Sequence, residues 1–159
     1  MQKTRRVDKD DVVDAVLSAS RALVAVAARS LAGAEAEVSL PQYRALVVLA
    51  GRGPQRASDL ADELHVHSST AGRMTERLVR KGLVDRERST EDRRTVVLRL
   101  TQRGKELVDD VTRRRREEIS HLVRRVPVAD RPHLVSALQA LSTAAGETPE
   151  QDWSTGWRL

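Results

Sequence analysis

The chain has 159 residues, with 28 lysines and arginines against 23 acidic residues and a formal net charge of +5 at pH 7. This length fits one domain, or one domain per subunit of an oligomer, and the arginine-rich positive charge favours a polyanionic partner. The sequence has no cysteine, which excludes disulfides, cysteine zinc ligands and a thiol redox switch. It has no apolar N-terminal signal region and no run approaching the roughly 18 apolar residues that span a bilayer, so we expect a cytoplasmic protein. One tyrosine and two tryptophans are its only aromatic residues, too few for the base-stacking surface that binds single-stranded nucleic acid.

Two amphipathic helices are predicted in the first third of the chain. Apolar residues recur at three- and four-residue spacing over Val12–Leu31, which predicts a long helix ending at Gly33. Residues Ser39–Gln42 then have the pattern of a capping box, in which the first and last side chains each accept a hydrogen bond from the other residue's backbone N–H. This pattern predicts a second helix that continues to Ala50 and is terminated by the glycines and proline of residues 51–54.

Residues 57–82 have the pattern of two short helices joined by a tight turn. In the first helix, of about three turns, we expect Ser58 to be the N-cap and the apolar face to consist of Leu60, Ala61, Leu64 and Val66. The chain breaks at His65, and a second helix is predicted from Ser68 to Lys81, ended by Gly82. Its inward side is expected to be Ala71, Met74, Leu78 and Val79, and its outward side Arg73, Thr75, Glu76, Arg77 and Arg80.

Two helices joined by so short a turn form a helix-turn-helix. In this motif the second helix lies in the major groove of double-stranded DNA, and its N-terminal residues meet base edges. The residues expected at the DNA are Ser68, Ser69, Thr70, Arg73 and Arg77. Exposed arginines on a helix are often only a solvated face, but the motifs around Arg73 and Arg77 favour a groove or phosphate contact.

A β-hairpin is predicted directly after the helix-turn-helix. Residues 83–88 and 94–100 both have extended patterns, and in the second segment Val96, Leu98 and Leu100 alternate with more polar positions, as in a half-buried strand. The five residues 89–93 between them are turn formers and charges. A hairpin in this place is a wing, and Arg93 and Arg94 at its tip suit the narrow, negative minor groove of DNA.

The sequence LADELHVHSSTAGRMTERLVRKGLVDRE, followed by STEDRRTVVLRLTQRG, resembles the winged-helix core of the MarR (multiple antibiotic resistance regulator) family. The resemblance includes the Asp92-Arg93-Arg94 motif at the wing tip and the Leu100-Thr101-x-x-Gly104 motif that opens the next helix, and it extends over residues 12–145. It implies that Arg94 inserts into the minor groove and that Asp92 orients it. One departure is that His65 and His67 occupy turn and cap positions where the family commonly has Gly and Ser. Because His tolerates a left-handed backbone, we expect the turn to be kept.

Two further helices follow the wing. Thr101 is expected to cap a helix reaching about Arg125, whose apolar stripe is interrupted by four consecutive arginines, Arg113–Arg116. Pro127 breaks this helix, and a last one is predicted from Asp130 to Ala145, with an apolar face of Leu134, Val135, Leu138 and Leu141. The tail that follows, which contains Trp153 and Trp157, has a loop-like composition.

The terminal helices predict a homodimer. Each carries an apolar stripe, and a chain this small has little core of its own to cover both, so a second copy is the expected partner. A two-fold dimer would place its recognition helices roughly 34–36 Å apart and require palindromic double-stranded DNA. The predicted fold is therefore mainly α with a small β-hairpin, divided into an N-terminal dimerisation helix (1–38), a winged helix-turn-helix domain (39–101), C-terminal dimerisation helices (102–146) and a flexible tail (147–159).

Other chemistry is poorly supported by the sequence. The histidines at 65, 67, 121 and 133 lack the spacing of a metal-binding motif, and no Ser-His-Asp arrangement or phosphate-binding glycine loop is legible, so we expect neither metal, cofactor nor enzymatic activity. For Arg113–Arg116 a solvated face is favoured over an anion-accepting cleft.

These observations predict a dimeric winged helix-turn-helix transcription factor, most plainly a repressor. Response to a small aromatic or phenolic ligand is implied only by the family resemblance. The same resemblance places the ligand between the first two helices and the long helix after the wing, where Tyr43 is the one aromatic residue available to contact it. Two alternatives remain: a constitutive architectural DNA-binding protein without effector, and a winged helix used as a protein-interaction module.

Overall fold

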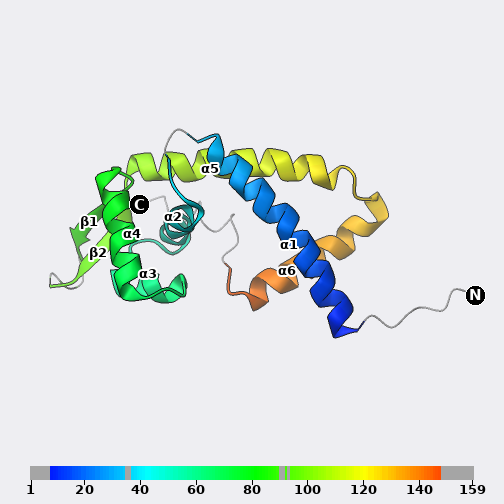
Figure 1. The fold of residues 1–159 in the computed structure, drawn as a ribbon, viewed down its shortest axis with the longest axis horizontal. Helices are drawn as coiled ribbons and strands as arrows, with labels where there is room; N and C mark the ends of the chain where they lie inside the picture. The colour runs from blue at the N-terminus through cyan, green and yellow to red at the C-terminus, as the bar shows by residue number, and fades with distance from the viewer. Residues whose placement is uncertain (1–7, 35–36, 90–91, 93, 148–159) are drawn as a thin grey trace, which may run out of the picture.

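The computed structural model describes residues 8–34, 37–89, 92 and 94–147. The elements within these residues are α1 (Lys9–Ala32), α2 (Leu40–Arg52), α3 (Ala57–Glu63), α4 (Ser68–Arg80), β1 (Val84–Arg88), β2 (Val96–Leu100), α5 (Gln102–Val123), the 3-10 helix η1 (Val128–Asp130) and α6 (Arg131–Ala144). This confirms the expected class, mainly α with a small antiparallel hairpin. Figure 1 shows two parts: a winged-helix lobe (residues 39–101) at one end of α5, and an arm formed by α1, α6 and the distal half of α5.

The capping box at the start of α2 is present as predicted. The Gln42 side chain accepts from the backbone N–H of Ser39 at 2.9 Å, and the Ser39 hydroxyl accepts from the backbone N–H of Gln42 at 3.4 Å. These bonds satisfy two of the amide groups that a helix start leaves without intrahelical partners. The helix continues to Arg52, two residues further than expected, and ends at Gly53, whose φ of 79° is open to glycine at little cost.

The start of α3 corrects one expectation. The cap position is held by Arg56 without a side-chain hydrogen bond, whereas Ser58 lies inside the first turn and its hydroxyl donates to the Asp59 carboxylate at 3.2 Å. The helix has seven residues, which is about two turns rather than three. A serine side chain can cap a helix only if the serine is the residue at which the helix begins. Here the N-cap position lies two residues earlier, at Arg56.

The turn between α3 and α4 agrees with the sequence expectation. His65 has a φ of 52°, the only positive value among the described residues other than glycine. His67 takes the N-cap position of α4, although its side chain makes no capping hydrogen bond. Gly82, with a φ of 67°, follows the helix as expected.

The hairpin pairs β1 with β2 antiparallel, with Val84 opposite Leu100 and Arg88 opposite Val96. Leu98 and Leu100 are buried as predicted, but Val96 is 53% exposed because it lies at the far end of the hairpin, beyond the core. Gln55 forms an additional bridge to Leu98, with backbone N–H to O distances of 3.1 and 2.7 Å. The segment before α3 is thereby attached to the wing.

The start of α5 is packed tightly against the end of the recognition helix. The Thr101 hydroxyl accepts from the backbone N–H of Gly104 at 3.0 Å and donates to the Gly82 carbonyl at 2.7 Å. A Cβ on Gly104 would lie 2.1 Å from the Leu83 carbonyl oxygen, so only glycine fits there. Thr101 is therefore the cap that the sequence predicted. The helix ends at Val123, slightly earlier than expected, and the sequence did not predict η1.

One continuous core holds the winged-helix lobe and the first half of α5 together. Its most deeply buried large side chains include Leu46, Leu60, Leu78, Leu83, Val84, Val108 and Val111. Thr75 was expected on the outer face of α4 but is 1% exposed, and its hydroxyl donates to the Gly72 carbonyl at 2.9 Å. That bond satisfies its polar group inside the core. Val79, predicted inward, is only partly buried.

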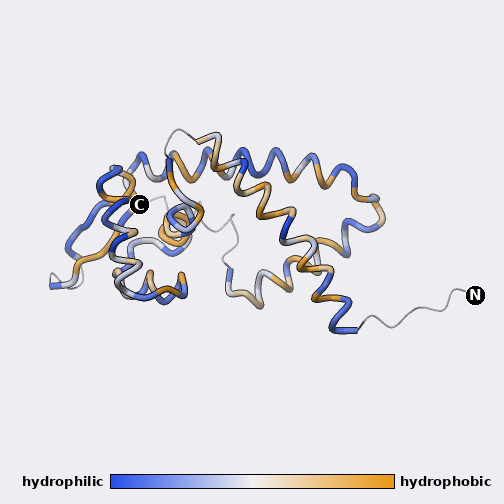
Figure 2. The backbone as a smooth tube through the Cα atoms, viewed as in Figure 1, coloured by the Kyte–Doolittle hydropathy of each residue, from blue (hydrophilic) through white to orange (hydrophobic). Residues whose placement is uncertain are grey.

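The arm is much less enclosed. In α1 only Val26, Ser30 and Leu31 are buried, and none of the α6 residues is. Figure 2 shows apolar segments along both helices, and the exposed large apolar residues of these two helices are Val12, Val13, Val16, Leu17, Leu23, Val24, Val135, Leu138 and Leu141. Among the described residues, no helix combines the length and apolar character that crossing a membrane requires.

Candidate nucleic-acid interface

The predicted recognition residues lie on the accessible side of α4. Ser68, Ser69 and Thr70 form its exposed first turn, and Arg73 and Arg77 are exposed on the two following turns. Within the described part of the chain, neither guanidinium pairs with an acid or donates a hydrogen bond to another residue. Five polar side chains are thus presented together on one helix, with no side-chain partner among residues 8–34, 37–89, 92 and 94–147, as a surface that contacts DNA requires.

The N-terminus of α4 adds backbone donors to this surface. No side chain caps it, because the His67 side chain accepts no hydrogen bond from the first turn. The helix dipole and the uncapped first-turn N–H groups make such an end attractive to a phosphate oxygen. The left-handed residue His65 fixes the direction in which the chain enters this helix.

The wing tip is organised around the Asp92 carboxylate. One carboxylate oxygen accepts from the backbone N–H of Arg94 at 3.0 Å, and the other accepts from the Thr95 hydroxyl at 2.9 Å. The bond from the Arg94 N–H, followed by that from Thr95, lowers the pKa of Asp92 below its usual value of 3.8. Asp92 therefore fixes the backbone at Arg94 rather than gripping its guanidinium. Arg93 lies outside the described residues.

The recognition helix and the wing are held in fixed relation by the shared core. Leu78 of α4 packs in the same cluster as Leu83 and Val84, which begin the hairpin, and Leu98 and Leu100, which end it. A groove contact by α4 and a minor-groove contact by Arg94 would therefore be made by one rigid unit.

Tyr43 belongs to α2 and faces α5, the region to which the family resemblance assigns a ligand, but it lies inside the core. It is 4% exposed, and its hydroxyl is 3.4 Å from the Thr112 hydroxyl. Three surface cavities of about 460, 500 and 520 Å³ are lined by residues other than Tyr43.

The arginine run on α5 is divided between two environments. Arg113 pairs with Asp110 and Glu117, and Arg114 pairs with Asp110 at 2.9 Å, as on a solvated helix face. Arg115 and Arg116 instead line one of the three cavities, beside Ile119 and Val123. In the described part of the chain, no cluster of three or more His, Asp or Glu side chains could hold a metal ion.

One group of interacting residues was missed by sequence reasoning. Arg44 and Arg52 of α2 contact Glu147 and Gly146, which follow α6. Arg44 and Glu147 are 103 positions apart, and neither belongs to a periodic pattern, so nothing in the local sequence could have indicated the contact.

Comparison with known proteins identifies the fold. The family model for the MarR family matches residues 38–96, which span α2, the helix-turn-helix and most of the wing. An uncharacterized HTH-type transcriptional regulator of Bacillus subtilis, YfiV, is 35% identical over 71 residues, covering 45% of this chain and 44% of that protein. The organic hydroperoxide resistance transcriptional regulator of the same organism is 34% identical over 67 residues, covering 42% of this chain and 46% of its own length. The chain thus matches less than half the length of these curated relatives.

Solved structures match nearly the whole chain. The crystal structure of RV1404 from Mycobacterium tuberculosis is 41% identical, with a TM-score of 0.83, and the match covers 91% of this chain and 99% of that one. Streptococcus pneumoniae FabT, solved in complex with DNA, shares the fold at 22% identity and a TM-score of 0.70, with 86% and 96% of the two chains covered. Because the family model matches the winged helix and a relative this similar matches over its full length, the chain belongs to the MarR family.

Proposed function

We propose that this protein is a transcriptional regulator that binds palindromic double-stranded DNA as a homodimer. The observation that carries the proposal is the exposed row of polar side chains on α4, for which the described residues supply no partner, together with a wing tip whose backbone is held by Asp92. In this role Ser68, Ser69, Thr70 and Arg73 meet base edges, and Arg77 contacts base or phosphate. Arg94, with Arg93, contacts the minor groove. Membership of the MarR family and the transcriptional regulators among its relatives support the same conclusion.

We further propose repression that a small aromatic or phenolic ligand relieves. The support is family analogy, with Tyr43 at the junction of the lobe and the arm as a ligand contact. Because Tyr43 is buried, Tyr43→Phe is a better probe than alanine: it keeps the ring in the core and removes only the hydroxyl. We expect weaker ligand release at unchanged ligand-free DNA affinity, measured by fluorescence anisotropy. An equal loss of both would mean that the Tyr43 hydroxyl serves the packing of the core and not the ligand. A constitutive architectural binder, the alternative, would coat DNA uniformly instead of giving a sharp footprint.

The decisive test of base reading compares two arginines of the same helix. Arg73→Ala should cost about 1–3 kcal/mol per half-site on the operator and relax the preference at one symmetric pair of positions. Arg80→Ala, at the last turn of α4, removes the same charge and should affect operator and random DNA alike. Footprinting of the DNA flanking the protein's own gene supplies the operator. If Arg73→Ala weakens binding to random DNA as much as to the operator, Arg73 contacts phosphate only.

A further inference from the structure

A groove with a volume of about 500 Å³ lies where α1 ends and α2 begins. The apolar part of its wall consists of Ala28, Leu31, Ala32, Ala34, Val38 and Leu40. Leu40 is 41% exposed, and the short alanine side chains leave room for a larger group. Glu37 and Ser39 complete the wall with side-chain oxygens that can accept a hydrogen bond. The groove thus suits a large apolar group that carries a hydrogen-bond donor.

The tryptophans of this chain have that character. The sequence contains two, Trp153 and Trp157, and both lie outside the described residues. An indole ring combines a large apolar surface with one N–H donor, so it is most stable where the ring is packed and the N–H meets an acceptor. The proposed contacts of α4 and the wing with DNA give these two rings no role.

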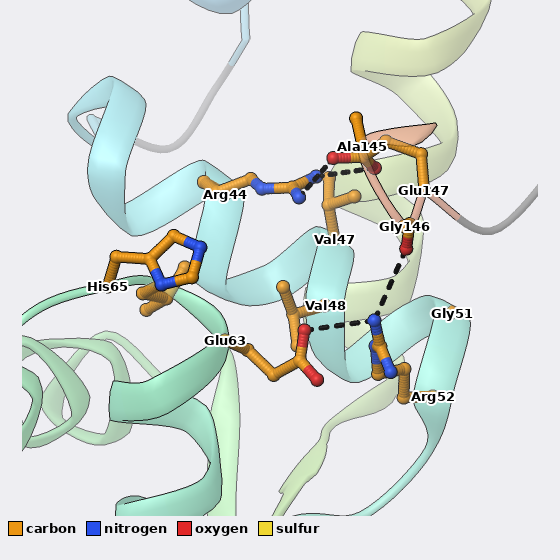
Figure 3. A pocket seen from close by; sticks show the side chains of 11 residues that line it. Arg44, Val47, Val48, Gly51, Arg52, Glu63, His65, Ala145, Gly146 and Glu147 are labelled. Atoms are coloured by element: carbon orange, nitrogen blue, oxygen red, sulfur yellow. Dashed lines mark hydrogen bonds and ion pairs between the residues drawn. The ribbon is translucent and has the colours of Figure 1, made fainter. Parts of the chain in front are cut away.

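The path of the chain after α6 brings Trp153 within reach of the groove. Glu147, the last described residue, is held by Arg44, whose two terminal nitrogens donate to its two carboxylate oxygens, one of them at 3.0 Å (Figure 3). Leu40 and Arg44 are four positions apart in α2, so they lie on the same side of the helix, about 6 Å apart along its axis. Six residues of extended chain span about 20 Å. The segment from Glu147 to Trp153 is therefore long enough to place the indole in the groove.

Charges on the two sides also match. Glu150 and Asp152 precede Trp153 in the sequence. Lys81 lies beside the groove, where its ammonium group donates to the backbone carbonyl of Glu37. An acidic side chain next to a docked indole would therefore meet a positive charge. Exposed pairs of this kind contribute little, so the ring supplies most of the binding.

We propose that Trp153 docks in this groove of its own chain. The indole packs on Leu31, Leu40 and the neighbouring alanines, and its N–H donates to Glu37 or Ser39. Because the segment is tied to α2 at Glu147, its effective concentration at the groove is on the order of millimolar, and a weak contact is enough to fill the site. Docking joins the end of α6 to the connection between the arm and the lobe.

The two tryptophans are themselves the probes for this contact. Trp157→Phe leaves Trp153 as the one fluorophore of its kind, and Trp153→Phe leaves Trp157. Each full-length protein is measured without DNA by fluorescence emission, acrylamide quenching and the NMR signal of the indole N–H. We expect Trp153 to emit at shorter wavelength than Trp157 and to be quenched less. Adding Leu40→Gln should lower the docking equilibrium constant about tenfold, because the contact with an apolar side chain is lost, and move Trp153 towards the Trp157 values.

Two further variants separate docking from a general effect on the fold. Ala28→Glu places a charged side chain in the part of the wall formed by α1 and should expose Trp153 as Leu40→Gln does. Leu122→Gln on α5 is the matched control, because Leu122 is also 41% exposed but does not line the groove. In that variant Trp153 should stay shielded. Circular dichroism confirms that each variant keeps its helices.

A mixture of two variants tests whether the groove belongs to the same chain. Chains that carry Trp153 and Leu40→Gln are combined with an excess of chains that lack both tryptophans but keep Leu40. Docking within one chain leaves Trp153 exposed, whereas shielding would mean that a second copy supplies the groove and would overturn the proposal. It is equally overturned if Trp153 is quenched as readily as Trp157 beside the unaltered groove, or if Leu122→Gln exposes it as much as Leu40→Gln does. Because no DNA is present, these outcomes are independent of whether Arg73 reads bases.

Discussion

The winged-helix lobe and the arm use similar amphipathic helices but bury them to very different extents. In α2, eight of thirteen residues are buried, whereas in the fourteen-residue α6 none is. Within the lobe, α3, α4 and β2 contact α2, and the adjoining α5 contacts it as well. The arm leaves apolar residues of α1 and α6 between 37% and 56% exposed. The comparison teaches that an apolar stripe predicts a buried face without identifying which chain covers it.

The largest expected effect comes from a charge placed on the arm. If a second copy covers α6, Leu138→Glu would bury an unpaired carboxylate at that interface, which costs several kcal/mol. We expect a monomer in sedimentation and a loss of palindrome binding of about 100-fold or more. Leu40→Glu is the matched control, because Leu40 is 41% exposed against 44% for Leu138 but belongs to the lobe.

Two outcomes would contradict this expectation. One is a Leu138→Glu protein that remains dimeric. The other is a monomeric Leu138→Glu protein that binds the palindrome as tightly as the wild type, which would remove the dimer from the DNA-binding mechanism. Equal losses in Leu138→Glu and Leu40→Glu would mean that the lobe and the arm do not differ in the way described.

A smaller effect is expected from cavities made in each part. Leu46 is fully buried in the lobe, so Leu46→Ala should reduce the free energy of unfolding by about 2–5 kcal/mol. Leu138→Ala, measured at a protein concentration low enough for the chain to be monomeric, should cost less than about 1 kcal/mol, as for other exposed sites. Urea denaturation followed by circular dichroism measures both. Similar costs in the dilute protein would show that α6 is enclosed by its own chain.

Substitutions in the wing are expected to have the smallest effects on DNA affinity, and they test how this part of the lobe contacts DNA. If Arg94 inserts into a narrow minor groove, Arg94→Ala should weaken sites with A/T-rich flanks more than sites with G/C-rich flanks. Arg94→Lys should restore only part of the loss, because an ammonium is more strongly hydrated. Asp92→Ala should show a weaker form of the same defect. Binding titrations at several salt concentrations distinguish insertion from a phosphate contact, which would be insensitive to flank and fully restored by lysine.

The Asp92 carboxylate also gives the wing tip a pH dependence of known sign. Its pKa in the folded protein is lowered from 3.8, so the ionised form is favoured by folding. Its contribution is complete above that ordinary value and is lost as the pH falls through the lowered pKa. The backbone amide NMR signal of Arg94 should therefore move only in strong acid, and Asp92→Asn should abolish that movement. A midpoint above 3.8 would contradict the hydrogen-bond geometry.

Sequence reasoning succeeded where the deciding interactions are local. The capping box of Ser39 and Gln42, the left-handed turn at His65 and the cap at Thr101 each depend on residues three or four positions apart, and all three are present. The same reasoning failed at Ser58 and Thr75. The first failed because the entry point of α3 is fixed by the bridge of Gln55 to the wing, and the second because a threonine buried with its hydroxyl bonded to its own helix resembles a surface residue in sequence.

The candidate DNA surface followed from the motif order, but its internal geometry did not. The sequence placed Asp92 beside Arg94 without indicating that the carboxylate would bind the backbone rather than the guanidinium. The ion pair of Arg44 with Glu147 joins residues that are 103 positions apart in the sequence. Only the three-dimensional path of α6 brings those residues together.

Gly104 packs so closely on the Leu83 carbonyl that α5 and the segment after α4 must move together. The first turn of α5 has no free space around Gly104. The helix has 22 residues, which corresponds to a length of about 33 Å. A tilt of about 5° at its distal end would then shift the recognition helix by about 3 Å, close to the rise of one base pair in B-DNA. If the protein binds two half-sites as the proposed dimer, small movements in the arm would thus produce a mismatch with the spacing of those half-sites.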